Sequence, residues 1–234
     1  MGGVFTRSIG RTSTGGGSDP YWSNVKLLCG FEGADGSTTL IDESSVARAL
    51  TAQSTAQIDT AQFKYGASSL LLNGTSDYVT AADSADFEFG SGEFTIEGFF
   101  RFSSLPSNAT LLEHFDGTNG WALRREGGAL KFNGITYTLQ WNGFLTINTN
   151  QWYHLAVDRD ASGHTRIYAD GVMQAKSTAT NAINAPTGSL YIGRAYVAVY
   201  YFPGHMDELR ITKGNGRYAS DGGFTVPASA YPRS

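Results

Sequence analysis

Apolar and polar side chains alternate with a period of two along most of the chain from Tyr21 onward, which is the pattern of half-buried strands. In residues 93–102, EFTIEGFFRF, one face of the strand is apolar: Phe94, Ile96, Phe100 and Phe102. The opposite face is mixed in character: Thr95, Glu97, Phe99 and Arg101. Such a mixture is typical of a sheet face that curves around a groove, or of an edge covered by a loop.

Residues 151–176, QWYHLAVDRDASGHTRIYADGVMQAK, combine a strand, a loop and a hairpin. The two sides of the strand carry Tyr153, Leu155 and Val157 on one and Trp152, His154 and Ala156 on the other. Asp170 and Gly171 lie between two extended halves and predict a type I′ turn, which needs positive φ at both central residues. We expect Asp158, Asp160 and His164 at a loop tip, where polar side chains serve solvation rather than catalysis.

The same alternation recurs elsewhere and predicts an all-β chain. In NVKLLCGFEG it places four residues on one side: Val25, Leu27, Cys29 and Phe31. Residues 44–63 are rich in Ser and Thr, which favours a long surface excursion with a short strand over a helix. About a dozen strands, separated by Gly-rich corners, have the spacing of a two-sheet antiparallel sandwich.

Composition narrows the class of protein. The 234 residues include 29 glycines, 13% aromatic and 16% charged residues, which suits short strands joined by tight turns. The net charge of −4 gives little support to a nucleic-acid partner. The single cysteine, Cys29, cannot form an internal disulfide, and its position predicts a buried, inert thiol. With no secretory signal or membrane-spanning run, we expect a soluble chain made in a cytoplasm without membrane insertion.

Residues 1–19 form a Gly-, Ser- and Thr-rich N-terminal arm ahead of a domain at residues 20–234. The arm is either a disordered terminus or a segment that orders against a partner, with Val4, Phe5 and Ile9 as apolar anchors.

Two groups of side chains are candidates for binding. A glycan site combines an aromatic platform with planar polar groups, and the outward positions offer Glu97, Phe99, Arg101, Trp121 and Arg124, with Tyr196, Tyr200 and Tyr201 in a rim loop. The alternative is that these aromatics belong to the core or to a subunit contact. In GHMDELRIT, the alternation places Asp207 on the buried side with Leu209 and Ile211, so its carboxylate needs a charged partner, backbone donors or a cation.

Several motifs in order resemble the laminin-G-like branch of the concanavalin A-like jelly rolls over about residues 20–232. They are LNGTSDY, FTIE, WYH, ADG and DELRI. The arm, DPYWSNVKLLCGFEGADGSTTLIDES and ITKGNGRYASDGGFTVPASAYP resemble more narrowly the laminin-G-like virion proteins of tailed bacteriophages.

The resemblance implies a jelly-roll sandwich and a structural calcium, with Asp207 as a candidate ligand and Glu32 as a neighbour. The alternative is that Asp207 accepts backbone hydrogen bonds to hold a corner. Related glycoside hydrolases carry Glu-x-Asp-x-Glu or Glu-x-Asp-x-x-Glu on one strand, which this chain lacks, and Glu93 and Glu97 are separated by about 13 Å of strand. Glu113, His114 and Asp116 form a second, ambiguous cluster.

We therefore predict a virion surface protein without enzymatic activity, a capsid decoration or a head or tail fibre. The arm would contact other virion proteins, the chain would form a homo-oligomer such as a trimer, and several copies would adhere to glycans through avidity. The alternatives are a free carbohydrate-binding or adhesion module and a glycoside hydrolase.

Overall fold

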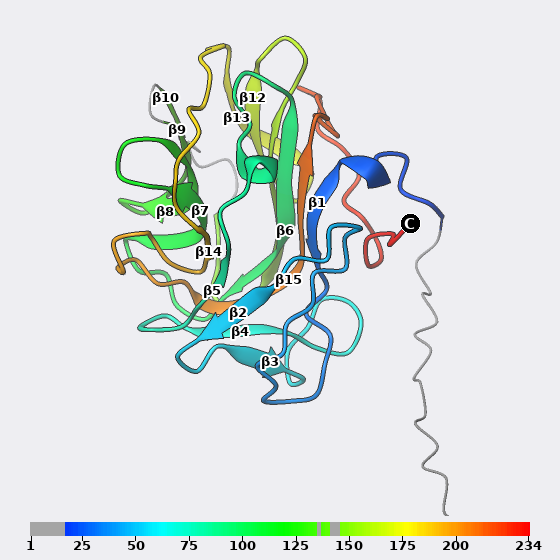
Figure 1. Cartoon of the computed structure of the whole chain (residues 1–234), viewed down its shortest axis with the longest axis vertical. Helices are drawn as coiled ribbons and strands as arrows, with labels where there is room; N and C mark the ends of the chain where they lie inside the picture. Colours follow the sequence, from blue (N-terminus) through cyan, green and yellow to red (C-terminus); the bar gives the residue numbers. More distant parts are fainter. Residues whose placement is uncertain (1–16, 135–136, 141–145) are drawn as a thin grey trace, which may run out of the picture.

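The computed structural model describes residues 17–134, 137–140 and 146–234, and in them the chain forms two antiparallel sheets packed face to face (Figure 1). The eight-stranded sheet has the order β13-β12-β11-β6-β15-β4-β3, with β1 also paired to β15. Its strands are β1 (Val25–Cys29), β3 (Gln57–Asp59), β4 (Ser69–Asn73), β6 (Phe94–Phe102), β11 (Trp152–Arg159), β12 (Thr165–Ala169), β13 (Val172–Ser177) and β15 (Pro203–Lys213).

The seven-stranded sheet has the order β10-β9-β8-β7-β14-β5-β2. Its strands are β2 (Leu50–Gln53), β5 (Tyr78–Ala81), β7 (Ala109–Phe115), β8 (Gly120–Glu126), β9 (Ala129–Gly134), β10 (Tyr137–Gln140) and β14 (Leu190–Ile192). Two single-turn 3₁₀ helices, η1 (Trp22–Asn24) and η2 (Ala85–Phe87), are the only helices in the described ranges. The predicted all-β sandwich is confirmed. None of these helices is long or apolar enough to span a membrane.

The core fills the space between the sheets and follows the predicted alternation. On β6, Phe94, Ile96, Phe100 and Phe102 point into it, and on β11 so do Tyr153, Leu155 and Val157. Cys29 is also buried there, as predicted, and burial raises the pKa of its thiol well above the usual value.

The β1 strand departs from a strict alternation. Leu27 and Cys29 face the core, but Val25 belongs with Leu28 to a second apolar cluster on the other side of the eight-stranded sheet. The cause is a shift of register between Val25 and Leu27 in the pairing with β15. Such a bulge inserts one residue and reverses the faces beyond it.

The turns follow the sequence prediction closely. Asp170 and Gly171 join β12 to β13 with φ values of 46° and 77°, so both central residues of the turn are left-handed, as a type I′ turn requires. Residues 44–63 contain the short strands β2 and β3 and no helix, as expected for a surface excursion.

The two ends of the described chain lie together beside β1 (Figure 1). The Asp19 N–H donates to the Ser234 carbonyl oxygen at 2.6 Å, and Asp19 is only 6% exposed. The predicted arm falls mostly outside the described residues, since residues 1–16 are not among them. Asp19 itself is buried and paired with Arg210 and Arg217.

Candidate functional site

The outer face of the eight-stranded sheet is covered by the chain itself. Residues 214–234 run back over this face, where Tyr231 packs with Val25, Leu28 and Phe99. Phe99 is 1% exposed and Glu97 has no exposed surface. The residues predicted to point inward and outward on β6 are assigned correctly. The open aromatic platform expected at Glu97 and Phe99 is not formed, because the C-terminal segment fills that space.

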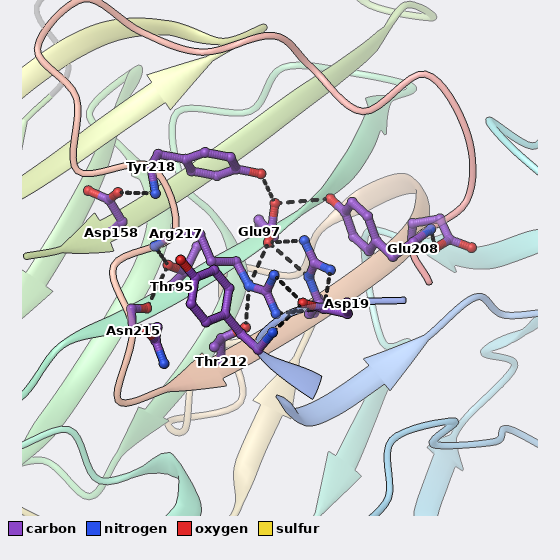
Figure 2. A network of polar contacts seen from close by, with 12 residues as sticks. Asp19, Thr95, Glu97, Asp158, Glu208, Thr212, Asn215, Arg217 and Tyr218 are labelled. Carbon is purple, nitrogen blue, oxygen red and sulfur yellow. Dashed lines mark hydrogen bonds and ion pairs between the residues drawn. The ribbon is translucent and has the colours of Figure 1, made fainter. Parts of the chain in front are cut away.

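Glu97 lies at the centre of a buried polar network under this segment (Figure 2). Its Oε1 accepts hydrogen bonds from Nε and Nη2 of Arg210 at 2.9 and 2.7 Å. Its Oε2 accepts hydrogen bonds from the hydroxyls of Tyr218 and Tyr231, the latter at 3.3 Å, and lies 3.3 Å from Nε2 of His154. Both carboxylate oxygens are therefore occupied by groups of the chain.

Asp19 connects the N-terminal end to the same network (Figure 2). Its Oδ2 accepts from Arg210 Nη1 at 3.0 Å, and Arg217 binds both oxygens at 3.0 and 2.8 Å. Burial by itself raises the pKa of Glu97, but the positive charge of Arg210 and the hydrogen bond from His154 lower that pKa far below its usual range. Two carboxylates and two guanidinium groups thus balance each other in a closed structural network.

Asp158 also belongs to this side of the molecule and corrects a prediction. It lies on β11, has no exposed surface and accepts the backbone N–H groups of Tyr218 at 3.1 Å and Ala219 at 2.6 Å. It therefore anchors the C-terminal segment and is not at a loop tip. Asp160 does lie in the loop, where its Oδ1 accepts from the N–H groups of Ser162 and His164, each at 2.9 Å.

Replacing Asp158 with Asn should change how stability depends on pH. Burial raises the pKa of Asp158 from 3.8 to about 6, although the Ala219 N–H and Arg166 oppose the shift. The folded state binds this proton more tightly, so the wild type loses stability as pH rises from 4 through 6. Asp158→Asn, which keeps an acceptor oxygen, should gain on the order of 2 kcal/mol relative to the wild type between pH 4 and 8. Urea unfolding at both pH values measures this difference.

The control is Asp160→Asn, for which the sign is opposite. Burial raises the pKa of Asp160, but hydrogen bonds from Arg166 and from the His164 N–H lower it overall. The ionised Asp160 side chain contributes to the free energy of unfolding above its unfolded-state pKa, and this contribution is lost as pH falls. The stability that Asp160→Asn loses relative to the wild type should therefore shrink toward pH 3. Equal pH slopes for the two variants would contradict the prediction.

Asp207 is buried, as predicted, but on the opposite face. Glu208 has a φ of 49°, and the register of β15 against β6 shifts between Asp207 and Arg210. This bulge places Asp207 opposite Phe99 on the outer side, whereas Leu209 faces the core. The alternation predicted across residues 205–212 is wrong at this point because a sequence pattern does not reveal a bulge.

The surroundings of Asp207 allow a test of the predicted calcium. Its Oδ2 accepts the N–H groups of Lys64 at 2.7 Å and Tyr65 at 3.0 Å, which is the corner-holding role. Its Oδ1 is buried and accepts no hydrogen bond of standard geometry among the described residues, so one oxygen is available to a cation. Glu32 lies at the same loop, with both oxygens 3.2 Å from the Ala67 nitrogen. No group of three or more His, Cys, Asp or Glu side chains suited to a metal occurs in the described parts of the chain.

Calcium at Asp207 stays a prediction, and thermal unfolding tests it. If Asp207 Oδ1 binds calcium, adding CaCl₂ to EGTA-treated protein should raise Tm, because a ligand that binds only the folded state stabilises it. The Asp207→Asn variant should show no such rise. An equal Tm in EGTA and in CaCl₂ for the wild type would assign Asp207 to the loop contacts alone.

The other predicted glycan residues are distributed over the molecule. Trp121 lies fully buried between the sheets, and its Nε1 donates to the Phe87 carbonyl oxygen at 2.8 Å, so the prediction that it faces outward is wrong. Arg101 is half-buried on the eight-stranded sheet, opposite Trp152. Arg124 lies on β8 of the seven-stranded sheet, and Tyr200 is 42% exposed on the loop before β15.

Charged side chains gather on the outer face of the seven-stranded sheet. Arg124 Nη2 lies 2.8 Å from Glu126 Oε2, and its Nη1 lies 3.8 Å from Glu113 Oε2. Lys131 Nζ lies 3.2 Å from Glu126 Oε1. Glu113 Oε1 accepts the Tyr196 N–H at 2.8 Å, which draws the loop toward β7. Burial raises the pKa of Glu113, against the effects of the Tyr196 N–H and Arg124.

Next to these charges is a group that we name the arginine–tyrosine cluster: Tyr78, Tyr191 and Arg194. The Arg194 guanidinium carbon lies 4.0 Å from the ring centre of Tyr78 and 4.5 Å from that of Tyr191. Tyr191 is paired with Glu113 across β14 and β7. The sequence pointed to Glu113 but not to this cluster, because Tyr78 lies more than a hundred residues before Tyr191 and Arg194 and is brought beside them by the pairing of β5 with β14.

The loop after Arg194 is an exposed apolar rim, which we name the rim loop (residues 196–200). Tyr196 is 37%, Val197 51%, Val199 40% and Tyr200 42% exposed. The Thr110 N–H donates to the Tyr200 carbonyl oxygen at 2.7 Å, so the rim loop is fixed to β7. Tyr196 and Tyr200 therefore lie in an exposed loop, as predicted, and this loop is beside the seven-stranded sheet.

Comparison with known proteins places this geometry in context. Residues 73–215, more than half of the chain, match the family described as the concanavalin A-like lectin/glucanases superfamily. No curated protein matches the sequence.

Solved structures share the fold at low sequence identity. The binding domain of paraclostridial mosquitocidal protein 1 is 16% identical, with a TM-score of 0.65, over 82% of this chain and 49% of that one. The receptor-binding domain of botulinum neurotoxin type G is 15% identical, with a TM-score of 0.60, over 82% and 48%. This chain thus spans about half the length of these toxin domains.

A third similar structure matches over nearly its full length. Domain 4 of AbnA, an extracellular GH43 arabinanase from Geobacillus stearothermophilus solved with arabinotriose, is 18% identical, with a TM-score of 0.62. The match covers 82% of this chain and 93% of that domain.

Proposed function

The chain belongs to the concanavalin A-like lectin/glucanases superfamily, and from that premise we propose that it is a non-catalytic glycan-binding module. Its binding surface is the outer face of the seven-stranded sheet with the rim loop. In the proposal, this module is displayed on the surface of a bacteriophage particle, as a capsid decoration or fibre, in several copies such as a trimer.

One observation carries the glycan-binding proposal: the chain covers one sheet face and leaves aromatic side chains exposed beside the other. Tyr196 and Tyr200 are exposed on the loop that follows Arg194, and the Tyr196 N–H binds Glu113, which lies 3.8 Å from Arg124. Exposed rings on the same side of the molecule as polar groups are what sugar sites use. Ala198 and Tyr200 also have left-handed φ values of 58° and 59°. Such backbone strain outside glycine tends to occur at functional loops. The structure of the AbnA domain in complex with arabinotriose supports a sugar as ligand.

The placement of acids supports binding without hydrolysis. A catalytic carboxyl group must reach the glycosidic oxygen, but Glu113 has no exposed surface and accepts the Tyr196 N–H through one oxygen. Glu126 is held by Arg124 and Lys131. Release of reducing sugar from a polysaccharide that binds the protein would contradict this part of the proposal.

The virion context is supported by the resemblance of two sequence stretches, one beginning at Asp19 and one at Ile211, to virion proteins of tailed bacteriophages. In the fold, Asp19 binds Arg210 and Arg217, so the two stretches lie together. Residue 17 leaves the domain on the side of the eight-stranded sheet, opposite the proposed binding face. An attachment through the arm would therefore leave the binding face directed outward. Many copies would raise weak glycan affinity through avidity.

A glycan array with a multimerised protein tests the binding proposal. We expect signal for a subset of glycans and its loss in a Tyr196→Ala, Tyr200→Ala double variant. The matched control is Phe63→Ala, which removes a ring that is 43% exposed elsewhere on the surface. Binding that survives the double variant and is lost in the control would place the site elsewhere.

The virion part has its own test. Quantitative mass spectrometry of purified particles should find the chain at a copy number that is a multiple of the capsid or tail symmetry. Its absence from particles would refute the virion context and leave the free binding module.

A further inference from the structure

Resting on the proposed function, we propose that the arginine–tyrosine cluster binds the carboxylate of an acidic sugar, with Arg194 as the residue that selects it. The ligand class is a glycan that carries a hexuronic or nonulosonic acid, and the shared chemical group is the sugar carboxylate. Neutral glycans lack the group that Arg194 would pair with.

The first argument is that no carboxylate of the described residues lies within ion-pair distance of Arg194. Its guanidinium packs on the rings of Tyr78 and Tyr191, and its charge lowers the pKa of the buried Glu113 without forming an ion pair with it. Its Nε is buried and has no hydrogen-bond acceptor. A ligand cannot reach Nε itself, but an external carboxylate would be a close anionic partner for the rest of the guanidinium, and hydrogen bonds between charged groups are the stronger ones.

The second argument is that the neighbouring acids already have partners. Glu126 is bound by Arg124 and Lys131, and Glu113 is held by the Tyr196 N–H with Arg124 nearby. Among the described residues of this group, Arg124, Lys131 and Arg194 are matched by two carboxylates, Glu113 and Glu126, so the group carries one surplus positive charge. The chain as a whole has a net charge of −4, so this excess is local.

The third argument concerns the geometry of the guanidinium group. Contact with Tyr78 and Tyr191 holds it in place through cation–π attraction while leaving its hydrogen-bond donors unused. A guanidinium held in this way presents a planar fork that matches a carboxylate with two parallel hydrogen bonds. Less side-chain entropy is then lost when the ligand binds.

The fourth argument distinguishes a sugar acid from a simple anion. A further ring adjoins the cluster, since Tyr201 lies 6.3 Å from Tyr78 between ring centres, and the exposed Tyr196 lies on the loop that follows Arg194. Tyrosine rings stack against the apolar face of a sugar ring, whereas an inorganic anion gains nothing from them. The combination fits a ring that carries a carboxylate.

Isothermal titration with four probes tests the proposal: trigalacturonate and 3′-sialyllactose as acidic glycans, with galactotriose and lactose as neutral counterparts. We expect the wild type to bind at least one acidic probe about tenfold or more tightly than its neutral counterpart. Arg194→Gln should remove this preference, and Arg194→Lys, which keeps the charge but not the fork, should retain part of it. Whichever acid binds identifies the source of the carboxylate.

The matched control is Arg101→Gln, which removes a half-buried arginine from the other sheet and should leave the preference intact. Thermal unfolding of each variant confirms that it is folded, and Arg194→Lys supplies the comparison if Arg194→Gln is not. Equal binding of acidic and neutral probes, or an unchanged preference in Arg194→Gln, would overturn this inference and leave glycan binding standing. Binding of none of the probes, together with an empty glycan array, would overturn both proposals.

Discussion

Arg210→Ala is expected to lower the free energy of unfolding by about 3–5 kcal/mol, which is the usual cost of removing one partner from a buried ion pair. Arg210 binds Glu97 and Asp19, and all three side chains are almost completely buried. Without Arg210, the one guanidinium left near Glu97 among the described residues is that of Arg217, at 3.8 Å. A buried carboxylate without a close counter-ion is strongly unfavourable. Urea unfolding at pH 7 measures the loss.

A second substitution separates the ion pair from simple loss of packing. In the Arg210→Ala background, Glu97→Gln removes the unpaired charge and should recover part of the stability, so the two substitutions are coupled. Lys176→Ala is the control at an exposed pair, because its partner Asp221 is 55% exposed, and should cost less than about 1 kcal/mol. A loss below 1 kcal/mol for Arg210→Ala would show that the network contributes little to stability.

Removing residues 226–234 is expected to destabilise the domain by about 3 kcal/mol or more, since it removes a fully buried aromatic side chain. Tyr231 is 1% exposed and packs on Phe99. Arg233, which is lost with it, pairs with Glu208 at 2.6 Å and Glu43 at 2.9 Å. The truncation also uncovers the outer face of the eight-stranded sheet. A lower urea midpoint together with binding of a hydrophobic dye would report both effects.

The Tyr231→Phe variant is the control for the truncation. It keeps the ring over Phe99 and removes the hydroxyl that contacts His154 at 2.9 Å and Glu97 at 3.3 Å. A cost of about 1 kcal/mol is expected for these hydrogen bonds. A truncated protein that unfolds at the same urea concentration as the wild type would show that the C-terminal segment is an accessory to the fold.

Local patterns predicted the strands and turns well, because each depends on neighbouring residues. The alternation in β6 and β11 identified their core faces, and Asp170-Gly171 identified the hairpin between β12 and β13. The failures occur where one extra residue changes the register. At Val25 and at Asp207 a bulge reverses the face, and a period of two contains no sign of where a bulge will lie.

The candidate site was predictable only in part. Arg124 and Tyr200 were identified from their outward position and aromatic character, and both lie by the seven-stranded sheet. Arg194 gave no signal in the sequence, because its importance comes from Tyr78, which strand pairing brings beside Tyr191, and from the absence of an ion pair to Arg194 among the described residues.

By itself, the sequence determined that this protein is an antiparallel β-sandwich with a jelly-roll resemblance, because the periodicity of side chains and the chemistry of turns act over a few residues. Only the tertiary structure decided which sheet face is open. The mixed sequence pattern of β6 is compatible with a face that binds a glycan and with a face that a chain segment covers. The segment that covers it begins more than a hundred residues later. Contacts between such distant residues are set by packing and charge pairing in three dimensions, which leave no regular pattern along the chain.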